Sequence, residues 1–303
     1  MSGFNFLRES QLHIHYGSNR YNVKITPNLS FSQTFAEDAY EVKTLHDQTK
    51  MFQGTSITKA NPANFSFEVH LTKEKDENIV LDLLTDYDTS SGEQLLKSFD
   101  MYVVSNNQTL KIEGCVITQG EFRFDKGSPL ILAVSGSGKK LERVGDASAI
   151  NSIGTLVSPS TTRTPTKPLL DVEVGGSDVS NLVAATLQVQ NNINWTPYET
   201  LQDSLSVTNA SNAMYPSSYS LNDRVVSGNI TQFFTNTNQS EFQTFNTNTS
   251  VAVKTIVDGS TFLNANLSGC MFTKRSNPAE VFTQTFDFRL VTSPSDLGTI
   301  ITY

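Results

Sequence analysis

The sequence predicts a mainly β protein with short helices, in which two β-sandwich or barrel domains arose from an internal duplication. Three observations lead to this fold class: a polar composition, alternation of apolar and polar residues, and a set of motifs that occurs twice. The 303-residue chain is 37% hydrophobic and 17% charged, and the remainder is rich in Ser, Thr, Asn and Gln. This composition is typical of β-rich proteins with polar turns, and the length fits about two domains.

The duplication is read from motifs that recur in the same order. Leu29–Gln33, Tyr40-Glu41 and Thr44–Asp47 in the first half return as Leu187–Gln190, Tyr198-Glu199 and Thr200–Asp203, and Gly114–Thr118 returns as Gly269–Thr273. The offset is 158 residues between Leu29 and Leu187 and 155 residues between Gly114 and Gly269. A constant order at a nearly constant offset indicates a tandem duplication. We therefore expect repeat one with an N-terminal arm at 1–145, a linker at 146–167 and repeat two at 168–303.

Repeat one shows the alternation most clearly at Phe65–Leu71, where every second residue is apolar, as in a strand with one buried face. Asp76–Asn78 precede apolar residues at helical spacing up to Leu84, which predicts a short helix with acids at its N-terminal end. A second helical stretch is expected at Glu93–Lys97. Further strands are expected around Ile14, Val23 and Ile25, and at Leu29–Gln33, Met101–Val104, Thr109–Thr118 and Leu130–Val134.

Repeat two has the corresponding strands and one weak helix candidate, Asn238–Phe245. The strands are expected at Leu187–Gln190, Asn229–Phe234, Val251–Val257, Thr261–Phe272 and Val281–Val291. The linker, Asp146–Lys167, is rich in Ser, Thr and Pro, so we expect an extended, exposed segment without a core of its own.

Each repeat also contains a long segment without a strand pattern, Ala36–Pro62 in the first and Trp195–Asn222 in the second. Loops of more than about 12–15 residues inside compact domains are usually functional. The alternative is an ordered β-hairpin without a special role. Trp195, the only tryptophan, is either a core residue or an interface anchor. The residues that we expect to contact other subunits or rings are Tyr40, Glu41, Leu45, Asp47, Trp195, Tyr198, Glu199, Leu201 and Asp203.

No catalytic, cofactor-binding or metal-binding constellation is complete, so we do not expect an enzyme. Ser135–Lys140 lacks the first glycine and the final hydroxyl residue of a phosphate-binding loop. His13 and His15 would share a strand face, but a third metal ligand is missing, and they are expected to be exposed. Cys115 and Cys270 occupy equivalent positions and are expected to be reduced, buried strand residues.

The charge and the hydropathy limit the partners. The net charge of −8 and the pI of about 5.0 argue against tight nucleic-acid binding. Neither a secretion signal nor a membrane span is visible, so we expect a chain that is made and folded in the cytoplasm.

The repeated order of strands, long flap, strong strand, short helix and paired strands resembles the tail tube proteins of long-tailed bacteriophages. The resemblance is carried by Leu29–Gln33, Tyr40–Asp47, Phe65–Leu71, Asp76–Leu84 and Gly114–Thr118, and all but the helix have a second copy. A duplicated member is similar to the major tail tube proteins of siphophages, whose trimeric rings have pseudo-hexameric symmetry.

This resemblance implies two tail-tube-like domains in a virion protein that is assembled in the host cytoplasm. Homotrimer rings would stack into a hollow conduit for genome ejection, and the DNA would pass without tight binding. The implied partners are the tape measure protein, the tail terminator and the distal tail proteins. In a ring, the free edges of the sheets would pair, and heterologous stacking would extend the tube. Three chains would carry a charge of −24, and acids facing the lumen would repel DNA.

Two other readings remain open. A tail terminator or a baseplate–tube adaptor would form one ring and stop. A carbohydrate-binding or adhesin module would fit the Asn- and Thr-rich strands, although it would not need two equivalent long flaps.

Overall fold

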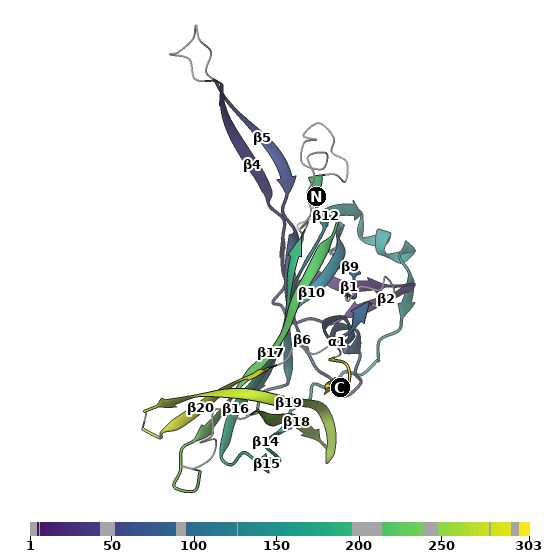
Figure 1. Cartoon of the computed structure of the whole chain (residues 1–303). Helices are drawn as coiled ribbons and strands as arrows, with labels where there is room; N and C mark the ends of the chain where they lie inside the picture. Colours follow the sequence, from purple (N-terminus) through teal and green to yellow (C-terminus); the bar gives the residue numbers. More distant parts are fainter. Residues whose placement is uncertain are drawn as a thin grey trace.

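The computed structural model describes residues 5, 7–42, 52–88, 95–125, 127–195, 214–238, 248–278, 280–291 and 297–303. The described chain is mainly β with short helical segments, which confirms the predicted class (Figure 1). The helical segments are α1 (Asn78–Thr85) and the 3₁₀ helices η1 (Leu7–Glu9) and η2 (Ala147–Ser152).

The first half combines a small sheet, in the order β2-β1-β9-β10-β12, with the beginning of a long sheet, in the order β3-β6-β11-β10. β10 takes part in both sheets because it is long and is bulged after Ile112, where Gly114 has a positive φ of 58°. The strands are β1 (Gln11–Tyr16), β2 (Asn19–Val23), β3 (Ser30–Ser32), β6 (Ala63–His70), β9 (Phe99–Val104), β10 (Thr109–Asp125), β11 (Ile131–Gly138) and β12 (Lys140–Gly145).

The second half repeats this order of pairing. Its small sheet runs β15-β14-β18-β19-β21, and its part of the long sheet runs β16-β17-β20-β19. Like β10, β19 changes sheets at a glycine with positive φ, Gly269 (φ 87°). The strands are β14 (Leu169–Val174), β15 (Ser177–Asp178), β16 (Leu182–Trp195), β17 (Tyr219–Phe233), β18 (Thr249–Val257), β19 (Ser260–Asn277), β20 (Thr283–Leu290) and β21 (Ile301–Thr302).

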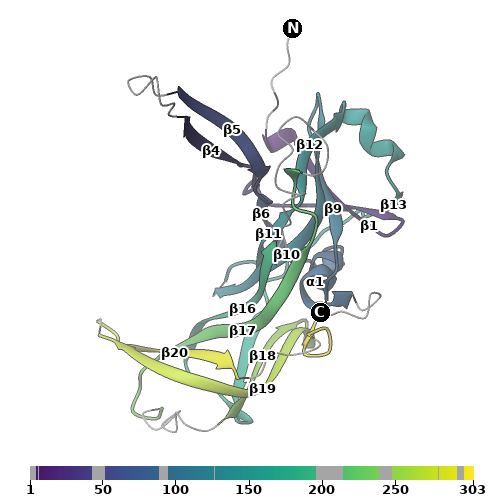
Figure 2. The same ribbon diagram turned by 45° about the horizontal axis from the view of Figure 1, so that its top comes forward.

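The two halves join through an antiparallel ladder between β10 and β16. Its register runs from Gln119 opposite Gln190 to Asp125 opposite Ala184. One continuous sheet therefore passes through both halves, in the strand order β3-β6-β11-β10-β16-β17-β20-β19 (Figure 2). We call it the long sheet.

The core lies between the long sheet and the elements packed on one of its faces, namely α1 and the small sheets (Figure 1). The buried apolar residues form one cluster that extends through both halves. α1 contacts β10 so closely that a Cβ on Gly120 would lie 2.3 Å from Cδ2 of Leu84. Cys115 and Cys270 are buried and free, as predicted.

The described residues of the segment Ala36–Pro62 form the hairpin that the sequence offered as the alternative to a long loop. β4 (Phe35–Val42) and β5 (Phe52–Ala60) form an antiparallel hairpin that projects from the body (Figures 1 and 2). The sequence has no regular apolar alternation here, so these strands gave no period-two signal.

Two further predictions about local structure need correction. Within the described part of Glu93–Lys97, Leu95–Leu96 is strand β8, paired with β7 (Tyr87–Asp88), and not a helix. The other helix candidate, Asn238–Phe245, lies outside the described residues except for Asn238, which is in a turn.

The linker is ordered and partly buried, which also differs from the prediction. It contains η2 and β13 (Thr155–Val157), and β13 pairs in parallel with β2. Ile150 and Thr166 are buried. The polar side chains that suggested a solvated segment bind carboxylates of the first half instead: Ser160 donates to Asp76, Thr164 donates to Glu74, and Arg163 pairs with Glu77.

Candidate functional site: the polar face and open edges of the long sheet

The face of the long sheet that points away from the core is polar in both halves. On β6 the buried residues alternate with Asn64, Ser66, Glu68 and His70. The strand registers bring side chains of the same face side by side, for example Ser66 next to Ser135 and Ser135 next to Gln119. The result is a surface of short polar side chains, in which the period-two pattern of the sequence separates core from solvent.

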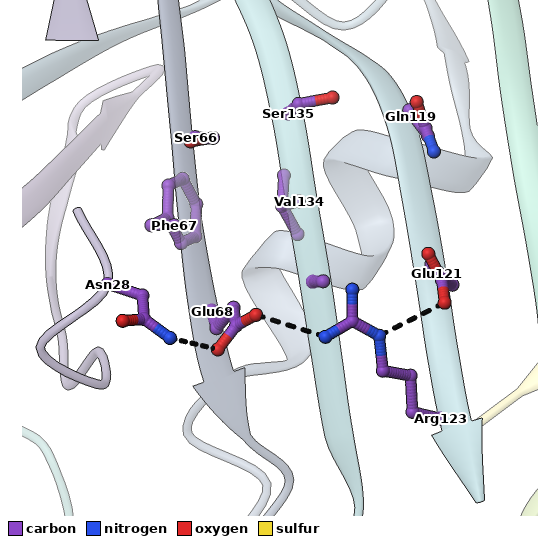
Figure 3. Close-up of a pocket in the computed structure, with 10 residues that line it drawn as sticks. Asn28, Ser66, Phe67, Glu68, Gln119, Glu121, Arg123, Val134 and Ser135 are labelled. Atoms are coloured by element: carbon purple, nitrogen blue, oxygen red, sulfur yellow. Dashed lines mark hydrogen bonds and ion pairs between the residues drawn. The ribbon is translucent and has the colours of Figure 1, made fainter. Parts of the chain in front are cut away.

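In the first half, this face carries a network of charged side chains around Arg123 (Figure 3). Arg123 Nε donates to Glu121 Oε1 at 3.0 Å, and Nη1 donates to Glu68 Oε1 at 3.2 Å. Asn28 Nδ2 donates to Glu68 Oε2 at 2.7 Å. The hydrogen bond to Glu121 and the nearby charges raise the pKa of Arg123. The guanidinium is thus directed along the surface toward carboxylates of its own chain.

In the second half, the same face has a hollow that is lined by residues of β16, β17, β19 and β20. Here Arg275 Nη2 donates to Asp287 Oδ1 at 2.7 Å, and the hydroxyls of Thr231 and Thr285 are 3.1 Å apart. Gly228 lies beneath the ring of Phe288, and a Cβ there would be 2.5 Å from Cζ of that ring. In the first half, Gly136 lies beneath the ring of Phe65 in the same way, at 2.4 Å.

The charges on the polar face are nearly balanced among its described side chains. Four carboxylates and three guanidiniums occupy it: Glu68, Glu121, Asp223 and Asp287 against Arg123, Arg275 and Arg289. Glu68 is on this face, whereas Asp82 is on α1, across the sheet.

The seam between the halves combines the β10–β16 ladder with buried side-chain hydrogen bonds. Asn191 Nδ2 donates to the carbonyl of Ile117 at 2.9 Å. Arg224 donates to Asn191 Oδ1 and to the carbonyl of Thr85, both at 2.7 Å, and its guanidinium lies 4.1 Å from the centre of the Tyr87 ring. Arg224 is 2% exposed, so these bonds are shielded from water.

Aromatic side chains extend the same seam. Trp195 Nε1 donates to Ser137 Oγ at 2.8 Å, and its ring packs on Tyr219, with 5.2 Å between ring centres. The Tyr219 hydroxyl donates to the carbonyl of Leu96 at 2.9 Å, and burial raises the pKa of Tyr219 to about 12. Trp195 therefore anchors one half to the other within the chain.

Both ends of the long sheet are open. β3 pairs with β6 on one side, and the stretch Met271–Asn277 of β19 pairs with β20; within the described ranges, neither has a strand on its other side. Phe35, next to the β3 edge, and Met271, on the β19 edge, are exposed. Unpaired backbone groups with exposed apolar side chains are typical of edges that pair with another chain.

The remaining residues predicted to make subunit contacts are placed only in part. Tyr40 and Glu41 are in strand β4 of the projecting hairpin. Leu45, Asp47, Tyr198, Glu199, Leu201 and Asp203 lie outside the described residues.

Of the seam residues, sequence reasoning singled out Trp195 but not Arg224 or Asn191. Arg224 and Asn191 stand in polar stretches and carry no signal of burial. For the polar face, the alternation along β6 was the available signal, and it identified the exposed positions without showing which strand lies beside them.

His13 is buried, at 5% exposure, and not exposed as expected. Burial, together with the charges of Arg20 and Lys24, lowers the pKa of His13 to about 4. Among the residues with described positions, no group of three or more His, Cys, Asp or Glu side chains could hold a metal ion. In the same residues, no helix is long and apolar enough to cross a membrane.

Comparisons with known proteins give first the class, bacteriophage tube proteins, which are structural components of a virion and not enzymes. The family model of the Bacteriophage Baseplate Tube Protein Family matches residues 2–303, and the chain belongs to this family. The chain is also similar to baseplate tube protein p140 of Escherichia phage T5, with 24% identity over 147 residues. That match covers 45% of this chain and 48% of the phage protein, so it spans about half the length of the curated relative. The comparisons support the resemblance at the level of a phage tube protein, and they do not single out the major tail tube.

Proposed function

We propose that this chain is the subunit of a ring in the tube of a phage tail, at the baseplate end, and that DNA passes through the ring during ejection. The family description supports the baseplate position, which corresponds to the adaptor reading of the sequence. The observation that carries the proposal is the seam: β10 and β16 join two halves of the same strand order and leave a free edge at each end.

The common strand order supports the duplication. It covers both sheets of each half, including the change of sheet at Gly114 and Gly269. Strand pairing also refines the alignment of the repeats. Phe65 on β6 and Gly228 on β17 occupy corresponding positions in the two halves. Phe65 pairs with Phe31, and Gly228 pairs with Leu187, so the counterpart of Leu187 is Phe31 and not Leu29.

The seam then predicts how two copies meet. In the proposed ring, β19 of one copy pairs with β3 of the next as β10 pairs with β16 within the chain. Transferring the register of the seam places Thr273 opposite Thr34 and Asn277 opposite Ser30 of the next copy. Because each chain supplies two units, three chains form a pseudo-hexameric ring, and pairing around the ring removes both edges of the long sheet.

The polar face of the long sheet lines the lumen in this proposal. A surface that conducts DNA must not hold phosphates, and Arg123 and Arg275 already bind carboxylates of the same chain. Sliding is therefore favoured because Arg123 and Arg275 are neutralised in place, and not by the strongly acidic lumen that the net charge suggested.

The β4–β5 hairpin is the proposed contact to the neighbouring ring, since it projects from the body at one end (Figure 2). In this arrangement, the neighbours along the axis are other tube rings and distal tail proteins, with the tape measure protein in the lumen before ejection. Replacing residues 36–59 by Asn-Gly retains the closing pair Phe35–Ala60. This variant should form rings that do not stack on their neighbours, and normal stacking would remove the hairpin from the proposal.

Electron microscopy of the purified chain over a concentration series tests the proposed function. Single hollow rings with threefold or pseudo-sixfold end views would support a baseplate ring. Long tubes would instead favour the major tube subunit, and a chain that remains monomeric at the highest concentration would overturn the ring.

A further inference from the structure

In both halves, one backbone hydrogen bond extends the long sheet just beyond the end of a strand, β6 in the first half and β17 in the second. In the first half, the N–H of Leu71 donates to the carbonyl of Leu130 at 3.0 Å. In the second half, the N–H of Phe234 donates to the carbonyl of Phe282 at 2.8 Å. Leu71 follows β6 directly as Phe234 follows β17, so the two pairs are counterparts.

In the first half, the linker covers this end of the sheet. The N–H of Leu130 donates to the carbonyl of Thr166 at 3.0 Å, and the N–H of Thr166 donates to the carbonyl of Leu71 at 3.3 Å. The Thr166 hydroxyl adds a bond to the same Leu71 carbonyl at 3.1 Å. Leu71, Leu130 and Thr166 are each only 1% exposed. An extended piece of chain thus satisfies the backbone and buries the apolar side chains.

In the second half, the same end is uncovered. Phe234 is 38% exposed, Phe282 is 55% exposed, and Val281 beside it is 57% exposed. Within the part of the chain that the structure describes, no hydrogen bond reaches the N–H of Phe282 or the carbonyl of Phe234. The ammonium of Lys274 lies 5.6 Å from the centre of the Phe234 ring. We call this end, with Phe234, Val281 and Phe282, the Phe282 groove.

We infer that the Phe282 groove binds the segment Leu7–Ser10 of a second copy, which precedes β1 as the linker precedes β14. The spacing identifies the segment. Thr166 lies eight residues before Val174, the last residue of β14, and Arg8 lies eight residues before Tyr16, the last residue of β1. Arg8 of the second copy would therefore take the place that Thr166 has in the first half. This inference rests on the proposed ring, in which repeat one of one copy follows repeat two of another.

Hydrogen bonds within the chain hold the segment Leu7–Ser10 in place before β1. Asn5 accepts hydrogen bonds from Ser105 and Asn107, and Asn106 donates to Glu9, so the segment is fixed to the turn between β9 and β10 of its own chain. Leu7 is 48% exposed, although it is apolar. Docking requires the single turn of η1 to open into an extended strand, and burial of Leu7 against the two phenylalanines favours it.

Hydrogen exchange of the full chain tests the inference. On assembly, exchange of the Phe282 amide should slow at least tenfold because it gains an acceptor. The Leu130 amide is the internal reference, since it is already bonded to Thr166 and should be slow at every concentration. Leu7→Asp should abolish the slowing, whereas Leu156→Asp, at a leucine of similar exposure (44%) on β13, should retain it.

The outcomes separate this inference from the proposed ring. Rings in the microscope with unchanged exchange at Phe282 would overturn the groove and leave the ring intact. If the chain remains monomeric, the ring fails, and a synthetic peptide of residues 1–10 added to the full chain tests the groove alone. Slower exchange at Phe282 with this peptide would support the groove, and no change at millimolar peptide would overturn it.

Discussion

β10 and β19 are counterparts in the two halves, but their surroundings differ. Beyond its bulge, β10 lies between β11 and β16, whereas β19 has β20 on one side and, in the described structure, no strand on the other. The same contrast holds at the sheet end, where Leu130 is 1% exposed and Phe282 is 55% exposed. The first half thus displays a completed contact, and the second half displays the surfaces that such a contact would cover.

The largest effect is expected from a disulfide placed across the proposed contact. Directly opposed residues in an antiparallel pair have Cα atoms about 4.5–5.5 Å apart, which is within disulfide range. Ser30→Cys with Asn277→Cys should therefore convert the chain almost completely into covalent trimers under oxidising conditions, as seen on a non-reducing gel. The natural cysteines should not interfere, because both are buried and burial raises their thiol pKa, to about 11 for Cys270.

The matched controls for this experiment are the two single variants and an off-register pair. Asn28 is exposed and lies two residues from Ser30, so Asn28→Cys with Asn277→Cys should cross-link far less. Equal cross-linking of both pairs would contradict the register, and no trimer from either pair would contradict the contact.

Alanine variants of the two glycines beneath aromatic rings test whether the cores of the two halves are packed equally tightly. Gly136→Ala and Gly228→Ala would each place a Cβ within 2.3 Å of a backbone carbonyl oxygen and against a phenylalanine ring. A backbone atom cannot move aside as the end of a flexible side chain can, so each should lower the free energy of unfolding by about 3 kcal/mol in urea denaturation. Gly259→Ala, where nothing lies within 4 Å and φ is +77°, should cost roughly 1 kcal/mol. A tolerated change in one half alone would show that the halves are packed differently.

The seam inside the chain depends on Arg224. Arg224→Ala leaves the carbonyl of Thr85 and the side chain of Asn191 without their buried donor, which should cost about 2–3 kcal/mol of unfolding free energy. In a double-mutant cycle, Asn191→Ala should cost less in the Arg224→Ala background than alone. Strictly additive effects would mean that the two residues do not act as one hydrogen-bonded unit.

The elements that the sequence predicted are those with one buried face. Phe65–Leu71 became β6, Asp76–Leu84 became α1, and the two cysteines were placed correctly, because burial on one side produces a regular period in the sequence. The β4–β5 hairpin lacks this period, and the sequence offered it only as the alternative to a long loop.

The pairing partners of each strand could not be predicted from this period. The period along β16 identifies its buried side but not its partners, so the β10–β16 ladder was not foreseen. Arg224 was missed because its burial depends on carbonyls that α1 and Asn191 bring to it, far away in sequence.

The smallest effect concerns a difference between the halves in the small sheets. His13 is buried on β1, and the residue at the same position of β14 is Asp171, which lies 158 residues later. The pKa of His13 is about 4 in the folded chain, below its usual value of 6.5, so the unfolded chain binds the proton first as the pH falls. Stability is therefore lost between pH 6.5 and 4, and roughly 1 kcal/mol should disappear between pH 7 and 5.5. His13→Leu should remove this part of the pH dependence, as measured by urea denaturation at pH 7 and pH 5.5; an unchanged pH slope in this variant would assign it to another group.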